Sequence, residues 1–147
     1  MRCLILVSLL LGLATLPAPG QAEKKAPDSA NGDLFQKLSY QEALAAAKTG
    51  KKAVMVEFAL STCGLCKAMD AKTFPDKQVQ QFIKDKTVAI KFTLDKEKPP
   101  SDLIKLIAGK IKTPTIVFIG TDGKELGRTA GFLAAKDFLD QANKFVK

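Results

Sequence analysis

Cys63 and Cys66 are the residues of this sequence whose type and spacing most directly indicate chemistry. A structural zinc site needs four ligands, and the chain has no histidine and no second pair of cysteines. Covalent haem attachment needs a histidine after the second cysteine, where Lys67 stands, and an iron–sulfur cluster lacks further thiolate ligands. A redox-active dithiol, a two-thiolate copper(I) site and a redox-inert disulfide therefore remain as interpretations.

The neighbours of this pair favour the redox interpretation. Residues 53–60 form an apolar run of strand length, and helix-forming residues continue from Cys66. The backbone N–H groups and the dipole at a helix N-terminus stabilise a thiolate. We therefore expect Cys63 to be a partly exposed nucleophile and Cys66 to be the more buried resolving thiol. Gly64 and Leu65 add no cation, so the disulfide is a weaker oxidant, which favours reduction as the direction of the reaction.

The N-terminus predicts export. An apolar run over residues 3–16 follows a single positive charge and is too short to span a bilayer comfortably. Gly20 and Ala22 supply the small residues that a signal peptidase requires, so residues 1–22 are interpreted as a signal peptide cleaved after Ala22. An uncleaved membrane anchor is the alternative. Residues 23–33 are polar and rich in breakers, which predicts a flexible linker.

The charge of the chain excludes one class of partner. The 147 residues include 23 basic and 15 acidic side chains, which give a net charge of +8. Cleavage of the signal removes Arg2 and Cys3, which lowers this charge by one and leaves the Cys63–Cys66 pair as the remaining thiols. The lysines are scattered and do not form the basic stripe with stacking aromatics that a nucleic-acid-binding face requires. A solvated basic surface attracts acidic partners in general and identifies none.

Residues 34–147 alternate between strand and helix patterns, which predicts one α/β domain. Strands are predicted at 34–38, 53–60, 88–94, 114–119 and 125–130, the last two joined by a turn at 121–124 that uses Gly123 for its positive φ. One helix is predicted from a Ser39 capping box to a stop at Gly50, a second from Cys66 to Lys72, and a third after an Asp76 cap. A fourth is predicted from Ser101 through Ile107 and Ala108. The last is predicted from a C-terminal apolar stripe of Phe138, Leu139, Ala142, Phe145 and Val146.

Several stretches of the chain resemble a known family. Residues 57–67, Glu-Phe-Ala-Leu-Ser-Thr-Cys-Gly-Leu-Cys-Lys, followed by residues 112–115 and Gly131, resemble the thioredoxin superfamily. Residues 67–79 are most similar to the periplasmic thioredoxin-like domain of the disulfide interchange protein DsbD and its stand-alone relatives. The resemblance covers essentially all of residues 34–147. It implies a thioredoxin-like fold, in which helices flank a central mixed sheet with a parallel core and an antiparallel C-terminal hairpin.

The resemblance implies a proton-transfer pair beside the dithiol. Glu57, six residues before Cys63, matches the buried acid that exchanges protons with the second cysteine in thioredoxins. Lys91 matches the lysine that neighbours this acid on the adjoining strand. Burial raises the pKa of a carboxyl, which suits Glu57 to accept the Cys66 proton. The alternative for Glu57 is a charge that faces solvent on an edge strand.

The resemblance also implies where the substrate lies. Pro114 matches the cis-proline that faces the dithiol, and Thr113 would offer its backbone to an extended substrate peptide. Gly64 and Leu65, between the cysteines, are expected to contact the substrate as well. Gly131 would let the chain pass near the active site or would serve as a simple turn glycine.

The residues and the resemblance together predict an exported thiol–disulfide oxidoreductase that reduces protein disulfides in the bacterial periplasm. Its redox centre would be the Cys63–Cys66 disulfide, with no other cofactor and no metal. The expected partners are protein substrates and an upstream thiol donor, such as a membrane thiol reductase, and the mature protein is expected to be a soluble monomer. A copper(I)- or partner-binding module without turnover is the alternative. The sequence departs from the family at two places. Thr62 stands where thioredoxins usually carry tryptophan, and Gly64-Leu65 stands in place of Gly-Pro. Both places affect the redox potential and the surface that contacts partners.

Overall fold

The computed structural model describes residues 34–106 and 111–147. The predicted signal peptide, the linker, and the helical positions Ile107 and Ala108 lie outside the described residues. The helices are α1 (Tyr40–Gly50), α2 (Gly64–Lys72), α3 (Lys77–Lys86), α4 (Ser101–Leu106) and α5 (Ala135–Phe145). The strands are β1 (Ala53–Ala59), β2 (Thr87–Thr93), β3 (Thr115–Ile119) and β4 (Glu125–Ala130).

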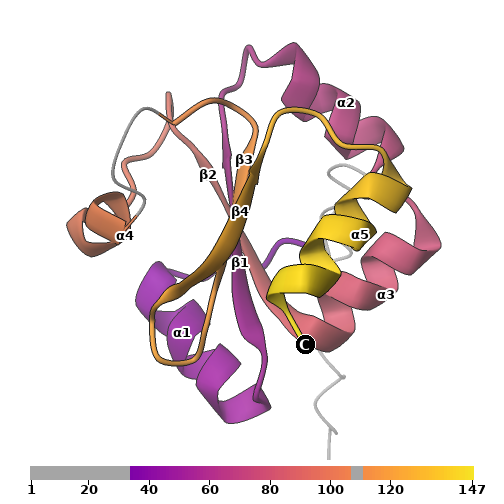
Figure 1. Ribbon diagram of the computed structural model, residues 1–147. Helices are drawn as coiled ribbons and strands as arrows, with labels where there is room; N and C mark the ends of the chain where they lie inside the picture. Colours follow the sequence, from indigo (N-terminus) through magenta and orange to yellow (C-terminus); the bar gives the residue numbers. More distant parts are fainter. Residues whose placement is uncertain (1–33, 107–110) are drawn as a thin grey trace, which may run out of the picture.

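The described strands form one mixed sheet in the order β2-β1-β3-β4 (Figure 1). β1 pairs with β2 in parallel and with β3 antiparallel, and β3 pairs with β4 antiparallel. The prediction of an α/β fold with a mixed sheet and a C-terminal hairpin is therefore confirmed, with β1–β2 as the parallel pair. β1 is a central strand, and all of its residues are buried, as its near-continuous apolar run indicates.

Helices cover both faces of the sheet. Figure 1 shows α1 and α4 on one side and α2, α3 and α5 on the other. Val56 and Phe58 of β1 pack in the core cluster that includes Tyr40 of α1, whereas Met55 packs in the cluster that includes Met69 of α2. Because successive side chains of a strand point to opposite faces, Glu57 lies on the face of Met55, which α2 covers.

The local signals for helix ends agree closely with the structure. Ser39 and Glu42 form the predicted capping box, and the Asp76 carboxylate accepts two backbone N–H groups of α3. The predicted stop at Gly50 is confirmed, because Gly50 is the last residue of α1 and Lys51 is the C-cap. Lys51 adopts the left-handed conformation with a φ of 53°, and its N–H bonds to carbonyl groups of the last turn.

The predicted strand over residues 34–38 is wrong. This segment forms no strand, and it runs beside the edge of the sheet with one backbone hydrogen bond, from Gln36 N–H to the Ala89 carbonyl at 2.8 Å. Leu34 is buried, and the Phe35 ring packs edge-on against Phe74 with 5.1 Å between centroids. Side-chain packing, and not a hydrogen-bonded ladder, therefore holds the segment.

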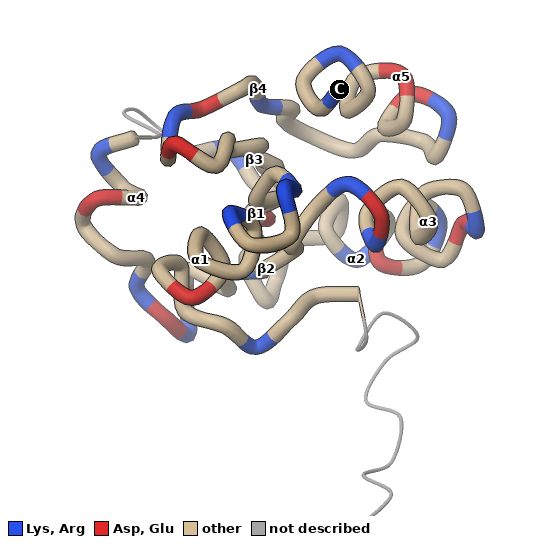
Figure 2. Tube along the Cα trace, turned by 90° about the horizontal axis from the view of Figure 1, so that it is seen from below, with Lys and Arg blue, Asp and Glu red and all other residues tan. Residues whose placement is uncertain are grey.

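The charges are distributed over the whole molecule. Figure 2 shows lysine and arginine on every side of the trace, interspersed with aspartate and glutamate, as the scattered lysines of the sequence indicate. Within residues 34–106 and 111–147, no helix has both the length and the hydrophobicity that a membrane crossing requires.

Candidate active site

The cysteine pair lies where β1 leads into α2. Cys63 and Cys66 are joined by a disulfide, and Cys63 is the N-cap of α2. Its sulfur accepts a hydrogen bond from the Cys66 backbone N–H at 3.1 Å. Cys63 is partly exposed and Cys66 is 2% exposed, which agrees with the predicted difference in access. The N–H groups of the first turn of α2 are thus placed to stabilise a Cys63 thiolate.

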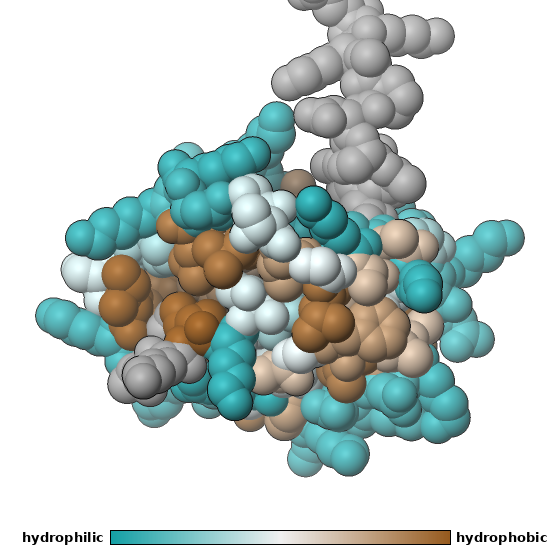
Figure 3. Space-filling view, turned by 90° about the horizontal axis from the view of Figure 1, so that it is seen from above, coloured by the Kyte–Doolittle hydropathy of each residue, from teal (hydrophilic) through white to brown (hydrophobic). Residues whose placement is uncertain are grey.

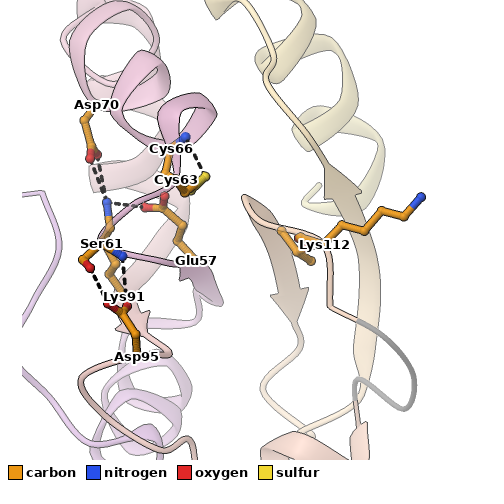
Figure 4. The surroundings of a disulfide bond; sticks show 9 residues. Glu57, Ser61, Cys63, Cys66, Asp70, Lys91, Asp95 and Lys112 are labelled. Carbon is orange, nitrogen blue, oxygen red and sulfur yellow. Dashed lines mark hydrogen bonds and ion pairs between the residues drawn. A yellow bond between two sulfur atoms is a disulfide. The ribbon is translucent and has the colours of Figure 1, made fainter.

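The turn that presents Cys63 is held by a carboxylate from the neighbouring loop. Within the turn, the Cys63 N–H donates to the Leu60 carbonyl at 3.1 Å. The Ser61 backbone N–H donates to Asp95 Oδ1 at 2.9 Å, and the Ser61 hydroxyl donates to Asp95 Oδ2 (Figure 4). Sequence reasoning missed both Ser61 and Asp95, because the contact depends on how two loops meet.

Glu57 is a fully buried acid beside the dithiol. It pairs with Lys91 in the β1–β2 register, and Lys91 Nζ lies 3.2 Å from its Oε2. Neither Glu57 oxygen accepts a well-aligned hydrogen bond from the described residues. In Figure 4 the Glu57 side chain extends from β1 toward α2, where the cysteines lie. Since β1 is central and Glu57 is 0% exposed, the alternative of a solvent-facing charge on an edge strand is wrong.

Burial controls the ionisation of this acid. Desolvation raises the pKa of Glu57 to about 7, although the Lys91 ammonium opposes the rise and the Asp70 carboxylate adds to it. A carboxyl with this pKa exchanges protons readily near neutral pH, which is the property that general acid–base chemistry requires.

Lys91 also contacts two residues that sequence reasoning missed. Its Nζ lies 2.9 and 3.0 Å from the two carboxylate oxygens of Asp70 on α2, and 5.4 Å from the centre of the Phe35 ring. Asp70 stands four residues after Cys66, one helical turn further along the same side of α2. This spacing was the available signal for Asp70.

The Thr113–Pro114 segment directly precedes β3 and lies at the same end of the sheet as the dithiol. Thr115 pairs with Phe58 near the end of β1, so the start of β3 is close to the β1–α2 junction. The Thr113–Pro114 peptide bond is cis, the isomer that the resemblance implies. Pro114 is buried and Thr113 is partly exposed. Figure 4 shows the preceding Lys112 side chain extending away from the disulfide.

Gly131 supports this segment through its backbone. Its N–H donates to the Pro114 carbonyl at 2.8 Å, and its φ of 84° is one that glycine adopts readily. A Cβ added at Gly131 would meet no atom within 4 Å. Conformation, and not close packing, is therefore what requires glycine here.

The end of the molecule that carries the dithiol has an apolar surface. Figure 3 views the end at the top of Figure 1, and apolar side chains occupy its middle with hydrophilic ones around them. Leu65 between the cysteines is 51% exposed, Leu60 is 37% exposed and Phe132 is 38% exposed, and Gly64 is exposed as well. Leu60 follows the end of β1, Phe132 follows the end of β4, and Gly64 and Leu65 begin α2. This surface can contact an apolar partner segment next to the sulfur atoms.

The site therefore joins the dithiol, Glu57 and Lys91 in one cluster and places Thr113 and Pro114 directly before the neighbouring strand β3. The part of the chain that the structure describes contains no group of three or more cysteine, aspartate or glutamate side chains arranged to hold a metal ion.

A family model for a thioredoxin-like domain matches residues 40–145. The chain belongs to this family. It is 34% identical over 114 residues to the thiol:disulfide interchange protein DsbD of Actinobacillus pleuropneumoniae, and 29% identical over 142 residues to DsbD of Salmonella typhimurium. These matches cover 76% and 93% of this chain but 19% and 24% of the relatives, so the chain spans at most about a quarter of their length.

Solved structures show the same fold. A thioredoxin from Thermus thermophilus superimposes with a TM-score of 0.61 at 28% identity, over 72% of this chain and 82% of that one. The oxidised C-terminal domain of Neisseria meningitidis DsbD superimposes with a TM-score of 0.60 at 22% identity, over 71% and 90%. With its cysteine pair at the start of α2, the chain is classed as a thiol–disulfide oxidoreductase of this family.

Proposed function

We propose that this protein reduces disulfide bonds of exported proteins, with Cys63 as the nucleophile and Cys66 as the resolving thiol. The observation that carries the proposal is the fully buried Glu57, which extends toward the dithiol and has a pKa raised to about 7. A purely structural disulfide has no need of such an acid, whose burial costs free energy. The names of the DsbD relatives, thiol:disulfide interchange proteins, are consistent with this chemistry.

The reaction proceeds through a mixed disulfide. The Cys63 thiolate attacks one sulfur of the substrate disulfide, forms the intermolecular S–S bond and releases the first substrate thiolate. Cys66 then loses its proton and attacks the Cys63 sulfur, which forms the Cys63–Cys66 disulfide and releases the second substrate thiolate. The substrate gains two electrons and the protein dithiol loses two.

Glu57 serves as the acceptor of the Cys66 proton in the second step. An acid with a pKa of about 7 is substantially ionised at neutral pH and can still hold the proton once it has received it. Lys91, at 3.2 Å, stabilises the ionised form and so keeps part of the Glu57 population ready to accept.

The catalytic cycle needs an electron donor and a compartment. The predicted signal peptide supports export, and the DsbD relatives support the bacterial periplasm as the place of action. The oxidised protein would be re-reduced by thiol–disulfide exchange with an upstream dithiol, such as that of a membrane thiol reductase. Thr113 and the exposed Leu65 would contact the substrate beside the sulfur under attack.

Trapping tests the proposed roles of the two cysteines. The exported protein is reduced, freed of reductant and mixed with oxidised insulin, as wild type, Cys66→Ser and Cys63→Ser. We expect the wild type to reduce insulin, Cys66→Ser to accumulate a covalent complex with it, and Cys63→Ser to do neither. If no variant traps insulin and the wild type does not reduce it, the proposal is wrong. Stoichiometric retention of copper(I) together with absent exchange would support the metal-binding alternative instead.

A further inference from the structure

We propose that Asp95 is a positioning residue for Cys63: its carboxylate fixes the turn that presents the nucleophilic sulfur. This inference rests on the proposed function, because it assigns Asp95 a role in the exchange reaction. The observation behind it is the pair of hydrogen bonds from Ser61, through its N–H and its hydroxyl, to the two oxygens of one carboxylate.

The topology places Asp95 opposite this turn. β1 and β2 are parallel neighbours, so the segments that follow them leave the sheet side by side. The Leu94 N–H donates to the Ala59 carbonyl at 2.9 Å, which continues the pairing to the last residue of β1. Asp95 directly follows Leu94, and Ser61 lies two residues after Ala59. Figure 4 shows the two side chains facing each other below the dithiol.

Among the described residues, the turn has one internal backbone hydrogen bond, from the Cys63 N–H to the Leu60 carbonyl at 3.1 Å. Ser61 lies two residues before Cys63. The Asp95 contacts fix both the backbone and the side chain of the residue in the middle of the turn. Without the Asp95 contacts, the Ser61 N–H and hydroxyl would bond to water. The position of Cys63 would then depend on its hydrogen bond to the Leu60 carbonyl and on its place as the N-cap of α2. A displacement reaction slows steeply when the nucleophile, here the Cys63 sulfur, is no longer held in line with the bond that it attacks.

Asp95 itself is held in place. The Lys96 and Glu97 N–H groups both donate to the Thr93 carbonyl, at 2.8 and 2.9 Å, and the Glu97 carboxylate accepts the Thr93 N–H at 3.1 Å. The loop therefore presents a preformed acceptor. The hydrogen bonds from Ser61 also lower the pKa of Asp95, and Lys96 adds a smaller effect in the same direction, so the carboxylate stays ionised during the reaction.

Two substitutions separate the positioning role from a simple charge effect. A carboxylate near Cys63 would disfavour the thiolate by like-charge repulsion, and Asp95→Ala removes both the charge and the hydrogen bonds. Asp95→Asn removes the charge alone, because its amide oxygen can accept the Ser61 N–H while its amide nitrogen donates to the Ser61 hydroxyl. Asp140→Asn, on the exposed face of α5, is a control for the loss of one surface carboxylate.

The experiment compares the rate constants with which the reduced proteins attack a disulfide substrate, after each is corrected for the thiolate fraction from its own thiol titration. We expect Asp95→Ala to be about tenfold slower, and Asp95→Asn and Asp140→Asn to stay within about twofold of wild type. Hydrogen exchange at the Ser61 amide should accelerate in Asp95→Ala and not in Asp95→Asn.

Three results would overturn the inference. Asp95→Asn could slow the reaction as much as Asp95→Ala, the thiolate correction could remove the difference, or the Ser61 amide could exchange at the wild-type rate in Asp95→Ala. The exchange measurement needs no substrate. If wild type fails to reduce any disulfide, the proposed function fails, while the amide result still decides whether Asp95 holds the turn.

Discussion

Lys91 serves two carboxyl groups with one positive charge. Its Nζ lies 3.2 Å from the fully buried Glu57 and 2.9 Å from the partly exposed Asp70. Each carboxylate competes with the other for the ammonium, so Glu57 receives less stabilisation of its ionised form than a private ion pair would give. Burial remains the dominant influence, and the balance leaves the pKa of Glu57 at about 7.

The sharing of Lys91 predicts that Asp70→Asn lowers the pKa of Glu57. The Asp70 carboxylate raises that pKa, and its removal also leaves the Lys91 charge to Glu57 alone. Carbon-13 NMR titration of the Glu57 carboxyl in the oxidised protein measures the shift. The acid limb of mixed-disulfide resolution should move to lower pH in parallel. Asp85→Asn, on α3, is the matched control. An unchanged Glu57 titration in Asp70→Asn would show that the carboxylates are not coupled.

The opposite shift is expected for Lys91→Met. This substitution keeps the aliphatic length, removes the charge that favours ionised Glu57, and so raises the pKa of Glu57 above its wild-type value. Resolution should then require a higher pH than in wild type, while the first attack by Cys63 changes less. The same carboxyl titration, together with single-turnover rates for the two steps, checks both statements. A lowered pKa would contradict the ion-pair geometry on which the expectation depends.

At the scale of elements, β4 and α5 hold β3, the strand that directly follows Pro114. The Phe145 ring of α5 packs over Gly127 of β4 and against Phe118 of β3, with 5.8 Å between the two ring centroids. A Cβ at position 127 would overlap the Phe145 ring. Glycine at this position therefore allows the helix to approach the sheet closely.

This contact predicts that Gly127→Ala destabilises the protein by about 1–3 kcal/mol, the usual range for overpacking. The ring must move off Phe118 to admit the methyl group. In a Phe145→Ala background the added methyl group meets no ring, so Gly127→Ala should then cost far less. Urea unfolding of the four proteins in this double-mutant cycle gives the coupling free energy. Additive effects of the two substitutions would mean that the clash is relieved in another way.

Elements with strong local signals were predictable from the sequence. The capping box at Ser39, the Asp76 cap and the apolar run of β1 each depend on residues adjacent in the chain, and each appears where it was predicted. Cys63 at the start of α2 followed from the same kind of local pattern. The segment 34–38 did not, because its short apolar pattern suits packing beside the sheet edge as well as a strand.

Contacts between distant loops and helices were not predictable in this way. The Glu57–Lys91 pairing was expected from the family resemblance and lies in the strand register. Asp70 reaches Lys91 only because α2 crosses that face of the sheet, and Asp95 reaches Ser61 only because two strand ends emerge together. The periodicity of a single sequence does not show which distant elements meet in the fold. A solvated polar residue on a helix or loop therefore cannot be distinguished in the sequence from one that pairs with a distant side chain.

At the scale of the whole molecule, the sheet is packed against apolar clusters on both faces, and one carboxyl group is buried among them. Among the described residues, Glu57 is the buried acidic residue, and the other side chains in the buried polar and charged group are threonines. Domains bury charges rarely, because desolvation opposes ionisation. The site that would serve the chemistry therefore has a cost for the stability of the entire fold.

This cost has a definite pH dependence. The pKa of Glu57 is about 7 in the folded protein, against an ordinary value of 4.5, so the folded state binds more protons than the unfolded state between these pH values. Stability should therefore fall as the pH rises through that window, by roughly 3 kcal/mol at most. Gln at position 57 cannot ionise, so Glu57→Gln should escape this fall in stability and become more stable than wild type above pH 7.

Urea unfolding of the two oxidised proteins at each pH measures the difference between their free energies of unfolding. Taking this difference cancels the effects of the exposed acids Glu42, Asp95 and Asp122, whose lowered pKa values act at lower pH and in the opposite direction. A difference that stays constant from pH 4.5 to 7 would show that Glu57 titrates as an ordinary carboxyl, and the proton-acceptor role would lose its physical basis.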